Sequence, residues 1–156
     1  MIPILLMAAW LPTPQNPTAN TEDVKSEDAI IKAVYDVISG PAGKARDWDR
    51  FRSLFDAKGT LCAVVKNRQG KKVAITMTPD DYVKNSGPYL EKNGFFERES
   101  KRKSMRSGDL VMVFSDYESR NKPDDKKPFE VGTNSLQLFT DGTRWYVHSI
   151  LWQGSD

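Results

Sequence analysis

The chain has 156 residues, and its 23 Lys and Arg against 21 Asp and Glu give a formal net charge of +2. A charge so near neutrality gives no indication of a nucleic-acid or anionic-membrane partner. With 38% hydrophobic and 10% aromatic residues the chain can bury a core, which excludes wholesale disorder. One cysteine and one histidine exclude an internal disulfide and a multi-cysteine or multi-histidine metal centre within one chain. We therefore expect no metal, no cofactor and no nucleic-acid partner.

Residues 1–20 differ from the rest, because they carry no charged side chain and contain four of the nine prolines. The apolar run over 2–11 is typical of a signal-peptide core and is too short to cross a bilayer. No Lys or Arg precedes the run and no clear cleavage site follows it, so a disordered Pro-rich leader is the alternative. We expect a leader over 1–20 and a single domain over 21–156. The expected location is periplasmic or secreted, otherwise cytoplasmic, with no integral membrane segment in the mature chain.

Three helices are expected early in this domain. The first is predicted to run from a cap at Ser26 to a stop at Gly40, because apolar residues recur between them every three or four positions. A second, short helix is expected over 47–55, with its large apolar residues on one side. A third is expected to begin after Thr78, whose hydroxyl can cap it, with Pro79 at the first helical position.

Patterns of period two predict strands in the remaining segments. Residues 60–66 and 71–77 are predicted to form a hairpin between the second and third helices. Asp141-Gly142 predicts a two-residue turn between the last two strands. The order of elements predicts an α+β domain, in which three N-terminal helices pack on a curved antiparallel sheet made of the short hairpin and a C-terminal four-strand meander. The meander strands are expected over 95–106, 109–120, 129–140 and 143–153.

Two short motifs carry a resemblance to a known superfamily: WDRF at 48–51 and DGTRWYV at 141–147. With the order of elements, they make residues 25–153 similar to the nuclear transport factor 2-like superfamily and its SnoaL-like branch. Three further segments, YESR at 117–120, NSLQL at 134–138 and ILW at 150–152, resemble an uncharacterised subgroup of exported bacterial members. The resemblance implies a cystatin-like cone, in which the sheet wraps around a long helix and leaves a pocket at its open end. Since members range from isomerases, cyclases and dehydratases to plain binding modules, the resemblance implies no single activity.

A pocket is expected on one face of the last two strands. A two-residue turn fixes their register and gathers side chains of mixed character on that face: Ser135, Tyr146, His148 and Trp152. Such mixtures line small-molecule pockets, although they also suit a half-exposed sheet face or a dimer contact. In better-known superfamily members, the positions matching His148 and Trp152 look into the cone, which favours the pocket. Aromatic residues with a polar tip are expected to complete the lining, with core or rim packing as the alternative: Tyr35, Trp48, Tyr82 and Tyr117.

The sequence contains no recognisable catalytic set, since neither a nucleophile–base pair nor a group of metal ligands is visible. Histidine is the side chain whose ordinary pKa lies nearest neutrality, so acid–base chemistry would use His148 or a buried carboxylate such as Asp116. The alternatives are a structural histidine and a surface carboxylate. We expect a non-catalytic domain that binds a small, partly apolar organic ligand. Two alternatives are an isomerase-, cyclase- or hydratase-type enzyme and an interaction module; a homodimer through the sheet face is compatible with each.

Overall fold

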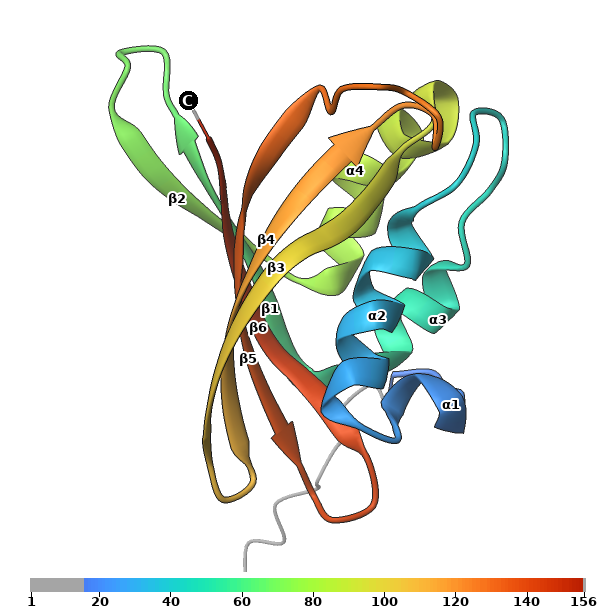
Figure 1. The fold of residues 1–156 in the computed structure, drawn as a ribbon, viewed down its shortest axis with the longest axis vertical. Helices are drawn as coiled ribbons and strands as arrows, with labels where there is room; N and C mark the ends of the chain where they lie inside the picture. Colours follow the sequence, from blue (N-terminus) through green and yellow to red (C-terminus); the bar gives the residue numbers. More distant parts are fainter. Residues whose placement is uncertain (1–15, 156) are drawn as a thin grey trace, which may run out of the picture.

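The computed structural model describes residues 16–155, so most of the predicted leader lies outside the described residues. Helices cover one side of a single curved sheet (Figure 1). The helices and strands follow one another in this order: α1 (Thr21–Val24), α2 (Glu27–Ile38), α3 (Trp48–Ser53), β1 (Phe55–Lys66), β2 (Lys72–Met77), α4 (Pro79–Asn93), β3 (Phe96–Ser107), β4 (Leu110–Arg120), β5 (Glu130–Thr140) and β6 (Trp145–Gly154).

The sheet has six strands in the order β2-β1-β6-β5-β4-β3. Its neighbouring strands run antiparallel except for β1 and β6, which are parallel. The sheet is therefore mixed, and the expectation of an antiparallel sheet is wrong at this one pair. Turn residues determine pairing within the hairpin and within the meander, but the junction between these two units depends on long-range packing that local patterns do not report.

The helical layer contains two long helices, α2 and α4, and two short ones, α1 and α3. The Ser26 side chain accepts a hydrogen bond from the Ala29 N–H at the start of α2. Thr78 and Asp81 form a reciprocal capping box at the start of α4. Helix α4 contains Pro88 and continues through it to Asn93. Proline removes one helical hydrogen bond, and the carbonyl left over belongs to a turn that lies at the surface.

The hydrophobic core lies between α2 and the inner face of the sheet. Phe51 and Phe55 are fully buried there and meet edge to face, with ring centroids 5.1 Å apart. Strand β4 presents alternate residues to the same core, so that Val111 and Val113 are buried while Met112 between them is exposed. The inner face of the sheet is thus defined by the core, and any side chain in register with these valines points toward the helices.

The connection between β5 and β6 differs from the predicted two-residue turn. Thr140 pairs with Trp145, so four residues form the turn. The Asp141 carboxylate accepts hydrogen bonds from the N–H groups of Thr143 and Arg144, at 2.8 and 3.0 Å, and stabilises this longer turn. The predicted register is therefore wrong by two residues next to the turn.

A β-bulge shifts the register again further along β6. Leu138 pairs with Val147 and Gln137 with Ser149, so His148 is the extra residue. Because one inserted residue reverses the faces of everything beyond it, Ile150 turns to the inner face of the sheet. Simple alternation along β6 would place Tyr146, His148 and Trp152 on one face, and the bulge moves Trp152 to the other face.

Candidate functional site

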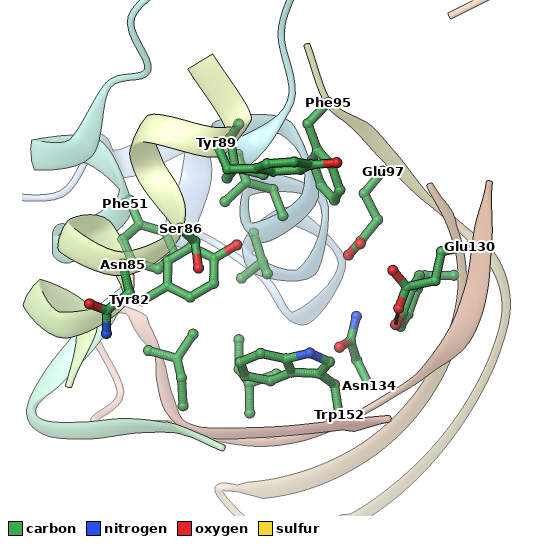
Figure 2. Close-up of a pocket in the computed structure, with 16 residues that line it drawn as sticks. Phe51, Tyr82, Asn85, Ser86, Tyr89, Phe95, Glu97, Glu130, Asn134 and Trp152 are labelled. Carbon is green, nitrogen blue, oxygen red and sulfur yellow. Dashed lines mark hydrogen bonds between the residues drawn. The ribbon is translucent and has the colours of Figure 1, made fainter. Parts of the chain in front are cut away.

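A cavity of about 370 Å³ lies between α4, α2 and the inner face of the sheet (Figure 2). Its walls are mainly apolar and aromatic, with two carboxylates and an amide on the strand side and the smaller polar side chains of Asn85 and Ser86 on the α4 side. Cavities of this size and character are typical of small-molecule sites. The lining residues are Val34, Ile38, Phe51, Leu61, Tyr82, Asn85, Ser86, Tyr89, Leu90, Phe95, Glu97, Tyr117, Glu130, Asn134, Ile150 and Trp152.

Two carboxylates, from Glu97 on β3 and Glu130 on β5, lie on the strand side of the cavity, as Figure 2 shows. The Ser119 hydroxyl donates a hydrogen bond to Glu97 Oε2 at 2.9 Å. The Tyr117 hydroxyl donates to Glu130 Oε1 at 3.0 Å. These donors come from the inner face of β4, which lies between β3 and β5 in the sheet. The geometry of the sheet therefore brings the two carboxylates together from strands that do not pair with each other.

The environment of Glu97 changes its proton affinity. Burial raises the pKa of this carboxyl from 4.5 to about 7, and the negative charge of Glu130 acts in the same direction. Hydrogen bonds from Ser119 and Asn134 to the carboxylate oppose the shift only in part. Glu97 therefore changes protonation near neutral pH, where it can hold either a proton or a negative charge inside the cavity.

Aromatic rings form the opposite walls of the cavity. Tyr82 stacks on Phe51 with centroids 5.2 Å apart and meets the edge of Trp152 at 6.3 Å. Tyr89 and Phe95 lie above them in Figure 2. Burial raises the pKa of the Tyr82 hydroxyl, so this group stays neutral. The ring faces offer apolar area together with a negative π-electron surface.

A hydrogen-bonded network behind the cavity fixes the Asn134 side chain. Asn134 Nδ2 donates to the Tyr35 hydroxyl at 3.1 Å, and that hydroxyl lies 2.6 Å from Ser115 Oγ. Ser115 in turn donates to Glu99. Burial raises the pKa of Tyr35 to about 12, which keeps the phenol protonated. The amide of Asn134 is thus held facing Glu97 by buried polar groups that have partners.

Gly132 allows Tyr117 to lie across β5. A Cβ atom at this position would stand 2.5 Å from the Tyr117 hydroxyl oxygen, which is closer than real Cβ contacts allow. Residues 117 and 132 are directly paired in the β4–β5 ladder. The missing side chain at one position therefore makes room for the ring at the other, and that ring carries the hydroxyl which holds Glu130.

Three of the residues predicted for the pocket, Tyr82, Tyr117 and Trp152, line this cavity. Tyr35 lies behind the lining, where it supports Asn134. Trp48 packs against α4, close to Gly87, and its indole N–H donates to a carboxylate of that helix. The aromatic part of the predicted site is therefore split between the cavity wall and the packing that supports it.

The structure places the other predicted site residues on the opposite face of the sheet. His148 is half exposed, and its Nδ1 lies 3.3 Å from Asp56 Oδ1. Tyr146 stacks on Phe139 with centroids 4.9 Å apart, and Ser135 pairs in register with an exposed leucine of β6. The expectation that these side chains share a face with Trp152 is wrong, because the bulge at His148 reverses the alternation between them.

Asp116 also lies outside the cavity, because it alternates with the inward-facing Ser115 and Tyr117 on β4. Its carboxylate accepts a hydrogen bond from Thr133 Oγ1 at 2.7 Å. This bond lies across the outer face of the sheet. The proposed catalytic role of Asp116 therefore has no geometric support, since the carboxylate points away from the space in which a ligand could bind.

The sequence reading missed Glu97, Glu130 and Asn134. Glu97 belongs to a run of charged residues on β3, and such a run is typical of a solvated edge strand. Neighbouring charged residues point to opposite faces of the sheet, which the composition of the run does not reveal. One signal could have identified it, since Phe95, just before β3, and Glu97 are two residues apart and both line the cavity. Pairing β3 with β4 places Glu97 opposite Ser119.

Among residues 16–155, the His, Cys, Asp and Glu side chains form no group of three that could hold a metal ion. The same part of the chain contains no helix long and apolar enough to cross a membrane.

Comparison with protein-family models and with curated proteins gives no match. Solved structures do resemble the chain. A Nostoc punctiforme protein of unknown function with a cystatin-like fold is 9% identical, with a TM-score of 0.59 over 81% of this chain and 86% of its own. A nuclear transport factor 2-like protein of unknown function from Silicibacter pomeroyi is 13% identical, with a TM-score of 0.55 over 82% and 92%.

A candidate ketosteroid isomerase from Shewanella frigidimarina is also similar, with 13% identity and a TM-score of 0.54 over 86% of this chain and 98% of its own. At this level of identity the likeness concerns the fold and leaves the activity open. The chain therefore has the α+β cone fold of cystatin-like and nuclear transport factor 2-like proteins, with N-terminal helices packed on a six-strand mixed sheet.

Proposed function

We propose that this protein binds a small, partly apolar organic molecule in the cavity of its cone, without transforming it. The observation that carries the proposal is the cavity of about 370 Å³, whose aromatic walls face a cluster formed by Glu97, Glu130 and Asn134. Aromatic walls supply binding area, while a few fixed polar groups orient a ligand. The polar groups are already held by neighbouring hydroxyl and amide groups, so little side-chain entropy is lost on binding.

A neutral apolar fluorophore, N-phenyl-1-naphthylamine, tests this proposal. We expect saturable fluorescence enhancement at one site per chain. Trp152→Ala removes a wall of the cavity and should weaken binding about tenfold or more. Leu151→Ala removes the neighbouring side chain, which is exposed on the outer face, and should leave binding unchanged. Circular dichroism verifies that both variants fold.

A bulky residue on α4 provides a second test that keeps Trp152 in place. Ser86 lines the cavity, so Ser86→Trp should fill it and abolish fluorophore binding. The proposal is overturned if wild-type protein binds neither this fluorophore nor choline nor 3,3-dimethylbutan-1-ol, or if the fluorophore binds the blocked variant as well as the wild type.

An enzyme of the isomerase, cyclase or hydratase type is the second candidate, and Glu97 is the observation that favours it. A carboxyl whose pKa is raised to about 7 can accept and return a proton near neutral pH. Such chemistry would use Glu97 as the base and leave His148 without a part, since the imidazole lies on the other face. Deuterium incorporation at the α-carbon of a cyclic ketone, followed by NMR, should occur in wild type and disappear in Glu97→Gln if this candidate is correct.

We further propose that two copies of the chain associate through the outer face of the sheet. That face carries large apolar side chains on β4, namely Leu110, Met112 and Phe114, which are all exposed. Contiguous apolar surface of this kind is characteristic of protein–protein contacts. This association is independent of the cavity, which opens on the other side of the sheet.

Export is a separate proposal that rests on the uncharged apolar run over residues 2–11. Intact-mass measurement of the protein from a periplasmic or culture-medium fraction should show a chain shortened near residue 20. A full-length chain confined to the cytoplasm would contradict it.

A further inference from the structure

We infer that the ligand of the cavity is a small organic cation, whose ammonium centre lies between the Glu97 and Glu130 carboxylates and the aromatic rings that face them. This inference rests on the proposed binding function and names the chemical class of its ligand.

The charges around the cavity all have one sign. Among the described residues that line it, Glu97 and Glu130 are the two acidic ones, and no Lys, Arg or His is present. Glu97 is desolvated by burial, whereas Glu130 is exposed to solvent. A buried carboxylate is destabilised in its charged form unless an opposite charge or donor compensates it. An anionic ligand would meet two like charges, and a neutral one would bring no charge to compensate Glu97. A cation is the class that compensates Glu97 and is also attracted by Glu130.

The carboxylates keep acceptor capacity for such a ligand. A carboxylate accepts up to about four hydrogen bonds. Glu130 receives one within residues 16–155, from Tyr117 to Oε1, and Glu97 is bonded by Ser119 and Asn134. Figure 2 shows the two carboxylate groups near each other on the same side of the cavity. An N–H or a polarised N–CH₃ group beside them would find two acceptors.

The aromatic walls are suited to the same charge. The ring of Tyr82 lies across the cavity from the carboxylates in Figure 2, with Tyr89 above it and Trp152 below. The negative face of an aromatic ring attracts an alkylammonium group, and tryptophan does so most strongly. The carbon substituents of an organic cation would meanwhile contact the apolar walls. Carboxylates on one side and rings on the others are thus complementary to one ligand class.

The inference predicts a pH dependence of binding. The titratable groups around Glu97 are Glu130 and the buried phenols of Tyr35, Tyr82 and Tyr117. The pKa values of these phenols are raised, so they stay neutral below pH 9. Glu97 changes charge near pH 7, and a cation binds better to its charged form. Affinity for a cation should therefore rise between pH 6 and pH 8.

Choline and 3,3-dimethylbutan-1-ol are matched probes for the test, because they share size and shape and differ in the charged nitrogen. We expect calorimetric or NMR titration at pH 8 to show choline binding at least about tenfold more tightly than the alcohol. Glu97→Gln and Glu130→Gln should each reduce this preference severalfold. Asp109→Asn removes a charge from the exposed β3–β4 turn and should leave the preference unchanged.

The outcomes distinguish the inference from the function on which it rests. Equal affinity for the two probes, or binding of the neutral fluorophore alone, overturns the cation and leaves the binding function intact. Absence of binding by all three probes overturns both. A preference for choline that persists unchanged in both glutamine variants also overturns the inference, because the charge must then be recognised elsewhere.

Discussion

Glu97 combines two properties that are seldom compatible, since it lies in the folded interior and still titrates near neutral pH. Its carboxyl faces a cavity instead of packed side chains, so a ligand or water can approach it. Ser119 and Asn134 stabilise its charged form, whereas burial and Glu130 favour the neutral one. The balance places the pKa where a small change in the surroundings, such as a bound cation, can shift the protonation state.

This raised pKa links Glu97 to the stability of the fold. The folded state binds the Glu97 proton more tightly than the unfolded chain does. The contribution of this proton to the unfolding free energy is therefore complete below pH 4.5 and is lost as the pH rises through 7. Glu97→Gln cannot ionise. From pH 5 to pH 8 we therefore expect the unfolding free energy of this variant to rise relative to wild type by about 2–3 kcal/mol.

Urea denaturation of both proteins at the two pH values measures the difference. Glu118→Gln is the matched control on the outer face, where Arg120 and Arg98 lower the pKa of the carboxyl. The unfolding free energy of Glu118→Gln should fall between pH 5 and pH 8 by the same amount as that of the wild type. If the unfolding free energies of Glu97→Gln and wild type differ by the same amount at pH 5 and pH 8, the assigned environment of Glu97 is wrong.

The residues of the site could be predicted from the sequence only where alternation along a strand is unbroken. Tyr117 follows the regular pattern of β4 and lines the cavity as expected. His148 was assigned to the cavity from a register that assumes no bulge, and the extra residue at that position reverses the outcome. Glu97 was overlooked because a charged strand at the edge of a sheet resembles a solvated one until its partner strand is known.

At the scale of elements, one arginine joins three segments that the sequence pattern treats separately. Arg46 is only 8% exposed, and its guanidinium donates to main-chain carbonyls at the end of α2, in the following loop and on α4. A planar fork with five N–H donors is suited to such a set of acceptors. The acceptors are the carbonyl oxygens of Ile38, Gly40, Pro41, Lys44 and Leu90.

Arg46→Met should therefore destabilise the fold strongly, although most arginines are exposed and tolerate substitution. Five main-chain carbonyls would lose their bonds to the guanidinium at once, although those of Gly40 and Pro41 keep a backbone N–H donor, and we expect a loss of about 3–5 kcal/mol in unfolding free energy. Arg46→Lys should recover only a small part, because a single ammonium group cannot reach all the carbonyls. Chemical denaturation followed by tryptophan fluorescence measures both.

Arg52→Met is the appropriate comparison, since Arg52 forms ion pairs with Asp49 and Asp80, whose side chains are exposed. Exposed pairs contribute little, so this variant should lose no more than about 1 kcal/mol. Equal losses for the two variants would show that the buried contacts of Arg46 have no special importance.

The elements themselves were largely predictable, because caps, turn residues and periodicity are local. Ser26 and Thr78 cap the helices that they were expected to cap. The six strands occur in the predicted order, although β1 begins earlier than expected, at Phe55. The parallel pairing of β1 with β6 could not be predicted in this way, because it depends on how the helices direct two separate sheet units together.

At the scale of the whole molecule, the curved sheet has two faces with different roles. The inner face buries the core and borders the cavity, whereas the outer face carries exposed apolar side chains. Its exposed edge strand β3 carries many Lys and Arg residues, which oppose edge-to-edge pairing. Association is thereby directed away from the edge and toward the face.

The proposed homodimer follows from the exposure of this face. Leu110, Met112 and Phe114 are 63%, 42% and 52% exposed along one strand, and a second copy would remove them from water. Analytical ultracentrifugation should find a dimer at micromolar concentrations. Phe114→Glu should convert it to a monomer, because a buried carboxylate would face an apolar surface. Ile75→Glu alters another half-exposed residue, on a strand at the far edge of the sheet, and should leave the dimer intact. A monomeric wild type, or equal dissociation of both variants, would contradict association through this face.

Since the cavity opens on the opposite side of the sheet, the monomeric Phe114→Glu variant should still bind the neutral fluorophore with unchanged affinity.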